Sequence, residues 1–126
     1  MYDKLLICVT GSKNSVEVSR VGLSCAGRNA HVIFLHVVEK LDETSRAIAD
    51  KELSHIKSIL MERPPVRPEF IVLEGDPKHK IIEIANKNEV SAIVVGETKE
   101  VHGESVSDYL LHHAATAVIS VKSKEI

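Results

Sequence analysis

The chain alternates throughout between apolar runs of strand length and amphipathic stretches of helical period, and this alternation constrains its fold most. The strands are predicted at Lys4–Thr10, His31–Val38, Phe70–Leu73, Ser91–Val95 and Ala117–Val121. Most of these runs are continuously apolar, which is typical of strands buried on both faces. Strict alternation of strands and helices predicts a parallel sheet covered on both sides. We therefore expect an α/β, three-layer αβα sandwich that forms one domain over residues 1–126.

The first two helices are predicted from their period. The first begins near Val16, turns Cys25 toward the core and is closed by Asn29 in a left-handed cap. The second runs from about Asp42 to Glu62, before two consecutive prolines. Its predicted buried stripe consists of Ala49, Leu53, Ile56 and Leu60.

The last two helices have clear start signals. Asp76 is a suitable N-cap and Pro77 fits the first helical position, and Asn88 can close this third helix. Ser105 is expected to cap a fourth helix, with Asp108 as a weak capping-box partner.

Composition argues against several classes of protein. The 16 basic and 18 acidic residues give a net charge of −2, and aromatic residues make up only 3%, so a nucleic-acid surface is not expected. No apolar run reaches the length of a membrane span, and the N-terminus does not resemble a signal peptide. Cys8 and Cys25 lack CxxC spacing and are expected to pack as small hydrophobic residues. These features predict a cytoplasmic protein with no membrane partner.

No catalytic or metal motif stands out. The seven histidines include no HxxxH or HExxH spacing on a helix, and His31 and His36 fall on opposite faces of one strand, so we expect no metal site. The patterns GxxxxGK[ST], GxGxxG and GxSxG are absent. A small hydrolase remains a hypothesis for which no nucleophile or base can be named.

Five segments, taken in order, resemble the universal stress protein family. They are KLLICVTGSKNS, HVIFLHVVE, EGDPKHKIIEIA, SAIVVGE and SVSDYLLHHAATAVISV. The resemblance implies an adenine nucleotide alpha hydrolase-like (Rossmann-like) sheet of order 3-2-1-4-5, with a cleft between strands one and four. It also implies a homodimer that pairs the last strand across a two-fold axis. In this chain the pairing residues would be Ala117, Val118, Ile119, Ser120 and Val121.

The family contains ATP-binding and non-binding members, and this sequence resembles the latter. Binders resemble one another in G-x2-G-x9-G-[S/T] after strand four. Here Gly96 is kept, Lys99 replaces the second glycine, Glu104-Ser105 stands at the final pair, and the loop is five residues shorter. Thr10 replaces an aspartate at the end of strand one.

The departures have physical consequences for phosphate binding. Lys99 adds a side chain where the backbone would approach a phosphate closely, and Glu104 adds an acid there. Two like charges about 4 Å apart cost roughly 4 kcal/mol at an effective dielectric near 20. The sequence therefore favours a non-catalytic, regulatory stress-response homodimer, with an unknown protein partner, that lacks ATP binding in the usual family mode.

The alternative is an adenine-nucleotide sensor that binds ATP or AMP. Its adenine would lie near Thr10 and Val38, and its phosphates near Gly96, Gly103 and Ser105.

Overall fold

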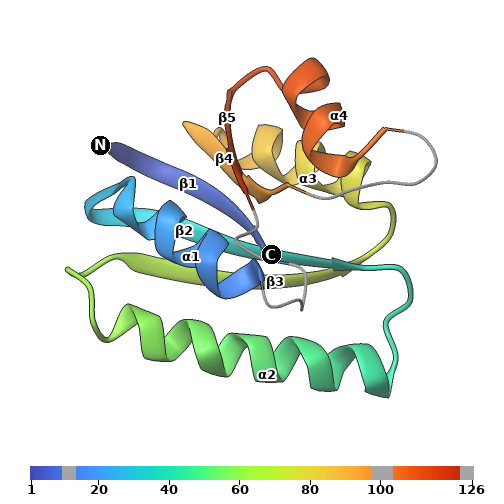
Figure 1. Cartoon of the computed structure of the whole chain (residues 1–126), viewed down its shortest axis with the longest axis horizontal. Helices are drawn as coiled ribbons and strands as arrows, with labels where there is room; N and C mark the ends of the chain where they lie inside the picture. Colours follow the sequence, from blue (N-terminus) through green and yellow to red (C-terminus); the bar gives the residue numbers. More distant parts are fainter. Residues whose placement is uncertain (10–13, 98–103, 123–126) are drawn as a thin grey trace.

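The computed structural model describes residues 1–9, 14–97 and 104–122. In these ranges five strands and four helices alternate along the chain (Figure 1). The elements are β1 (Tyr2–Val9), α1 (Asn14–Ser24), β2 (Ala26–Val38), α2 (Glu43–Leu60), β3 (Arg67–Glu74), α3 (Pro77–Asn88), β4 (Ala92–Gly96), α4 (Val106–His113) and β5 (Ala117–Val121). None of the described helices has the length and apolar character needed to cross a membrane.

The strands form one parallel sheet of order β3-β2-β1-β4-β5, so the predicted fold and strand order are confirmed. The pairing brings Leu6 of β1 level with Ile33 of β2 on one side and with Ile93 of β4 on the other. The strand order reverses between β1 and β4. In open α/β sheets, ligands bind at such a reversal, beyond the carboxyl ends of the strands.

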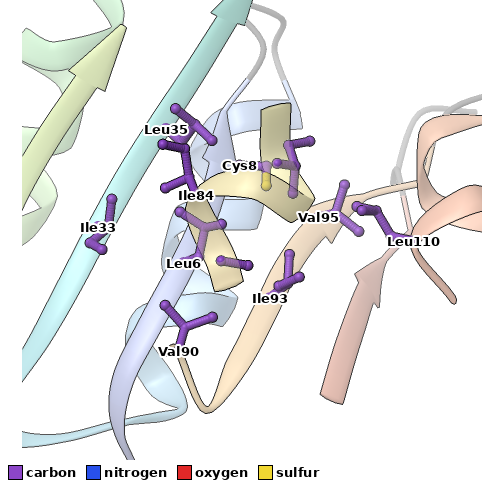
Figure 2. Close-up of a cluster of buried hydrophobic side chains, with 11 residues drawn as sticks. Leu6, Cys8, Ile33, Leu35, Ile84, Val90, Ile93, Val95 and Leu110 are labelled. Atoms are coloured by element: carbon purple, nitrogen blue, oxygen red, sulfur yellow. The ribbon is translucent and has the colours of Figure 1, made fainter. Parts of the chain in front are cut away.

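Two hydrophobic cores lie on opposite faces of the sheet, and a different pair of helices covers each face (Figure 1). α1 and α2 cover one face, where Val18 and Ile56 pack against Phe34 and Val94. α3 and α4 cover the other face, and Figure 2 shows the side chains gathered there. This second cluster includes Leu6, Cys8, Ile33, Leu35, Ile84, Val90, Ile93, Val95 and Leu110.

The prediction for the end of the first helix was wrong. α1 ends at Ser24, and β2 already begins at Ala26, five residues before the predicted start. Pairing with β1 explains the difference, because Tyr2 N–H donates to the Cys25 carbonyl at 3.0 Å and Ala26 is the register partner of Tyr2. Asn29 does adopt a left-handed conformation (φ 63°), but it lies inside β2 and caps no helix.

The caps of the later helices are largely as predicted. Asp76 caps α3 with Pro77 in its first turn, as predicted, and α2 begins with a capping box of Asp42 and Ser45 that was not predicted. The closing residue of α3 differs from the prediction, because Glu89 (φ 52°) is its left-handed C-cap.

The buried face of α2 also differs from the predicted stripe. Ala49 and Ile56 are buried as expected, but Leu53 is only half-buried. Glu52 is buried instead, with Ile59 completing that face. The helix therefore turns an acidic side chain into the interior.

Candidate functional site

An apolar pocket of about 90 Å³ lies at the carboxyl edge of the sheet, on the face that α3 and α4 cover. It is situated where the strand order reverses, as the fold leads one to expect. Three strands and both helices contribute to its wall. The lining residues are Cys8, Val9, Leu35, Val37, Pro77, Ile81, Val95, Gly96 and Val106.

Gly96, at the end of β4, has a packing reason to be glycine. A Cβ built on it would lie 2.6 Å from Nδ2 of Asn14 and 3.1 Å from Cγ2 of Val18. The Asn14 amide, at the start of α1, therefore occupies the space that a side chain at position 96 would need. The glycine kept from the nucleotide pattern is required by this contact, whether or not a phosphate binds.

Ser105 is the N-cap of α4, as predicted. Its side chain is buried, its Oγ accepts a hydrogen bond from Asp108 N–H at 3.1 Å, and it lies 3.2 Å from Oγ of Ser107. Capping uses this hydroxyl as an acceptor, so its O–H can still donate, either to Ser107 or to a bound anion. Helix N-termini still favour anions, because their amides carry partial positive charge.

Glu104, just before this cap, is paired with the last turn of the same helix. Its Oε1 lies 2.7 Å from Nδ1 of His112. The hydrogen bond to Glu104, followed by the charge of that carboxylate, raises the pKa of His112 above its usual value. The predicted acid is therefore present beside the helix start, but its charge is partly balanced when His112 is protonated.

Cys8 lines the pocket but is not a nucleophile. Its side chain is buried, and burial raises the pKa of the thiol to about 12. The thiolate, which is the reactive form, is therefore negligible at neutral pH. Cys8 packs as a small hydrophobic residue, as predicted, whereas Cys25 follows α1 and is only partly buried, so its predicted place on a helix facing the core was wrong.

The structure brings together only some of the residues predicted to contact a nucleotide. Gly96 lies in the pocket wall, and Ser105 immediately precedes Val106, another wall residue. Val38 does not line this pocket. It borders a separate open hollow that follows β2, and its neighbour Val37 borders both this hollow and the pocket on the α3 side. Thr10 and Gly103 lie outside the described residues.

Cys8 and Val37 were missed as lining residues. The alternation of side chains along β2, which separated His31 from His36, would have separated Val37 from Val38 in the same way. Within the described residues, His, Cys, Asp and Glu side chains do not gather in groups of three or more that could hold a metal ion.

Comparison with known proteins settles the family. The profile of the universal stress protein family matches residues 1–122. The chain belongs to the universal stress protein family. Membership supports a role in the stress response.

Two curated universal stress proteins match along nearly their whole length. A universal stress protein of Methanothermobacter thermautotrophicus is 25% identical to this chain in an alignment 142 positions long. The alignment covers 98% of this chain and 97% of the relative. Universal stress protein A homolog 1 of Coxiella burnetii is 29% identical, with 99% and 94% covered.

Solved structures of universal stress proteins share the fold. The Archaeoglobus fulgidus protein in complex with dAMP has a TM-score of 0.77 and 23% identity, covering 96% of this chain and 98% of the other. A universal stress protein in complex with cAMP has a TM-score of 0.73 at 21% identity, with 96% and 97% covered. An Arabidopsis thaliana family member with AMP bound has a TM-score of 0.71 at 19% identity, with 96% and 92% covered. This likeness establishes the adenine nucleotide alpha hydrolase-like fold.

Proposed function

We propose that this universal stress protein is a non-catalytic regulatory module that acts as a homodimer and does not bind ATP in the usual family mode. The observation that carries the second part is the contact between Gly96 and Asn14. The amide of Asn14 fills the space above Gly96, 2.6 Å from the position of a Cβ. A phosphate that approached Gly96 from the α1 side would have to displace that side chain, whereas the pocket beside Gly96 lies on the α3 side.

Electrostatics supports the same proposal. Glu104 stands at the start of α4, beside the helix amides that would otherwise favour a phosphate, and among the described residues His112 is the one that pairs with it. Because His112 is exposed and deprotonates as the pH rises, the acid repels a triphosphate most strongly in alkaline solution. No residue described in the pocket offers an activated base or nucleophile, which supports a non-catalytic role.

An adenosine monophosphate-class ligand is the second candidate. It is favoured by the apolar pocket at the sheet reversal, which suits a flat base, and by the three relatives whose structures hold dAMP, cAMP or AMP. A monophosphate carries fewer negative charges than ATP does, so the carboxylate of Glu104 repels it less.

Thermal-shift titration with ATP, ADP and AMP, with and without magnesium, separates these functions. A ligand that binds only the folded state raises stability by RT ln(1 + [L]/Kd), or about 2.7 kcal/mol at a hundredfold excess over Kd. We expect no shift with about 1 mM ATP. A clear shift with AMP alone would support the second candidate, and a shift with sub-millimolar ATP would refute the proposal.

Two variants identify the cause of the exclusion. Glu104→Gln removes the charge and Glu104→Gly also restores the glycine of the family pattern, so a gain in ATP binding by either one assigns the exclusion to Glu104. Glu83→Gln, an exposed acid on α3, is the matched control and should leave the thermal shift unchanged.

The homodimer is proposed through β5, which lies at one edge of the sheet. Ala117 and Ser120 are exposed there, and Val118 and Ile119 are only half-buried. An edge strand carries unpaired backbone donors and acceptors, which favour pairing with another strand. A second copy of β5 would satisfy these groups in both chains at once.

Light scattering on charged variants tests the interface. Ile119→Lys and the more exposed Ser120→Lys should yield monomers, with folding checked by circular dichroism. Val72→Lys places the same charge on β3, at the opposite edge of the sheet, and should leave the dimer intact. Unchanged dimers with both β5 variants would show that another surface pairs the subunits.

A further inference from the structure

A second cavity, of about 50 Å³, lies on the other face of the sheet, between α2 and the strands β2 and β3. Its walls are mostly apolar, and they include the stacked rings of Phe34 and Phe70, whose centroids are 5.3 Å apart. The sheet separates it from the pocket beside Gly96, although Val9 of β1 borders both. Val38, Gly96 and Ser105, the described residues that were predicted to contact a nucleotide, do not line it.

Two buried polar side chains from different elements border this cavity. His36 of β2 and Glu52 of α2 have 9% and 7% of their side-chain surface exposed, and Nδ1 of the histidine lies 3.3 Å from Oε2 of the glutamate. The contact does not have hydrogen-bond geometry. Among the residues that the structure describes, His36 Nδ1 and both carboxylate oxygens of Glu52 have no hydrogen-bond partner.

Unpaired buried polar groups are uncommon in folded proteins because each one loses its hydrogen bonds to water. A carboxylate has two acceptor oxygens and is most costly to leave in apolar surroundings. A bound molecule that donates hydrogen bonds to both oxygens would remove this cost, once the Glu52 side chain rotates to bring these fully buried oxygens to the cavity surface. A ligand with two N–H donors would therefore complement the two carboxylate oxygens of Glu52.

The charge of the cavity points to a cation. Glu52 lies in its wall and the exposed Asp50 also borders it, whereas the described residues contribute neither lysine nor arginine to that wall. His36, 3.3 Å from Glu52, is the other ionisable side chain in the wall, and it opposes a cation only when it is protonated. The faces of Phe34 and Phe70 add partial negative charge of the kind that attracts cations.

Size narrows the choice of cation. A water-sized probe needs about 10–15 Å³, so 50 Å³ admits a group of roughly three to four non-hydrogen atoms. A guanidinium or amidinium group has this size, is planar, stacks on aromatic faces and pairs with a carboxylate through two parallel N–H bonds. We propose that the cavity bordered by His36 and Glu52 binds the guanidinium or amidinium head group of a small organic cation.

The cavity is accessible to such a ligand. Val72 in its wall is 39% exposed and Asp50 is exposed, which marks an opening to solvent between β3 and α2. His36 also borders the open hollow of about 370 Å³ that follows β2. The rest of a ligand would extend from this opening while its head group contacts Glu52.

Titration of the full chain with methylguanidine, followed by methyl NMR, tests the proposal. We expect saturable shifts at Ala49, Leu53 and Ile56 up to about 5 mM ligand, the range that so small a molecule can reach. Glu52→Gln should weaken binding at least about tenfold, because it keeps the shape of the side chain and removes its charge. Glu83→Gln is the matched control and should bind as the parent chain does.

A neutral ligand keeps the test decisive if Glu52→Gln destabilises the fold. Methylurea has nearly the shape of methylguanidine but no charge, and it should not bind. A blocked Gly-Arg-Gly peptide distinguishes the source of the head group, since its binding would extend the site from free guanidino compounds to arginine side chains. No saturable shift with methylguanidine, or equal binding of methylurea, would overturn the proposal and leave a cavity that holds water only.

Discussion

Replacing Gly96 by alanine should destabilise the protein through a contact that a second substitution can relieve. The added methyl would lie 2.6 Å from Nδ2 of Asn14 and 3.1 Å from Cγ2 of Val18, both closer than an ordinary contact of about 3.4 Å or more. Overpacking of this kind costs about 1–3 kcal/mol. For a domain of this length that corresponds to a fall in Tm of about 4 °C for each kcal/mol.

Asn14→Ala removes the nearer of the two contacts. Urea unfolding of the parent, both single variants and the double variant gives a double-mutant cycle. We expect the double variant to be more stable than the sum of the single effects by at least about 1 kcal/mol, since residues in contact couple by roughly 0.5–3 kcal/mol. The contact with Val18 remains, so rescue should be incomplete.

Gly22→Ala is the matched control. A Cβ at this buried position on α1 would lie 2.6 Å from Cδ1 of Ile7, so it should destabilise the chain to a similar degree. Asn14 is not among the atoms that it would meet, and Asn14→Ala should not rescue it. If the effects of Gly96→Ala and Asn14→Ala on the free energy of unfolding are additive, as those of Gly22→Ala and Asn14→Ala should be, the packing explanation for Gly96 is refuted.

Two further predictions concern titrating groups. The pKa of His112, raised by Glu104, should return toward its usual value in Glu104→Gln but not in Glu83→Gln, as measured by NMR titration. Folding raises the pKa of His112, so the Glu104–His112 pair should contribute its full stabilisation below pH 6.5, the ordinary pKa of histidine. This stabilisation should be lost as the pH rises through the pKa of His112 in the folded protein. Iodoacetamide should label Cys25 in the native protein and reach Cys8, whose pKa is about 12, only on unfolding. Mass spectrometry showing equal rates for the two thiols would contradict this assignment.

The strands and the caps were predictable because each depends on local chemistry. Runs such as Lys4–Thr10 are too apolar for any place but the interior of a sheet, and Asp42 and Asp76 satisfy the first amides of their own helices. The strand order followed from the resemblance to the family, and the structure confirms it.

The structural features that were not predicted depend on contacts between segments that are distant in the sequence. The early start of β2 at Ala26 requires the partner strand that begins at Tyr2, fixed by Cys25. The burial of Glu52 requires a small rotation of α2, which period alone does not specify because Leu53 is an equally good inward residue. Topology leads one to expect a pocket near Gly96, but its walls depend on which face each residue of β2 takes.

The two cavities share a strand, and this has a consequence for how the protein can change over evolution. His36 faces the α2 side of β2, and Val37, the next residue, faces the α3 side. Inserting or deleting one residue in the regularly paired part of β2, between His31 and His36, would exchange these faces, moving the imidazole into the aliphatic pocket and a valine opposite Glu52. Neither cavity can therefore be remodelled by a change of length in this strand without loss of the other. In this part of β2, the two cavities can therefore change independently by substitution of single residues, which leaves the strand register unchanged.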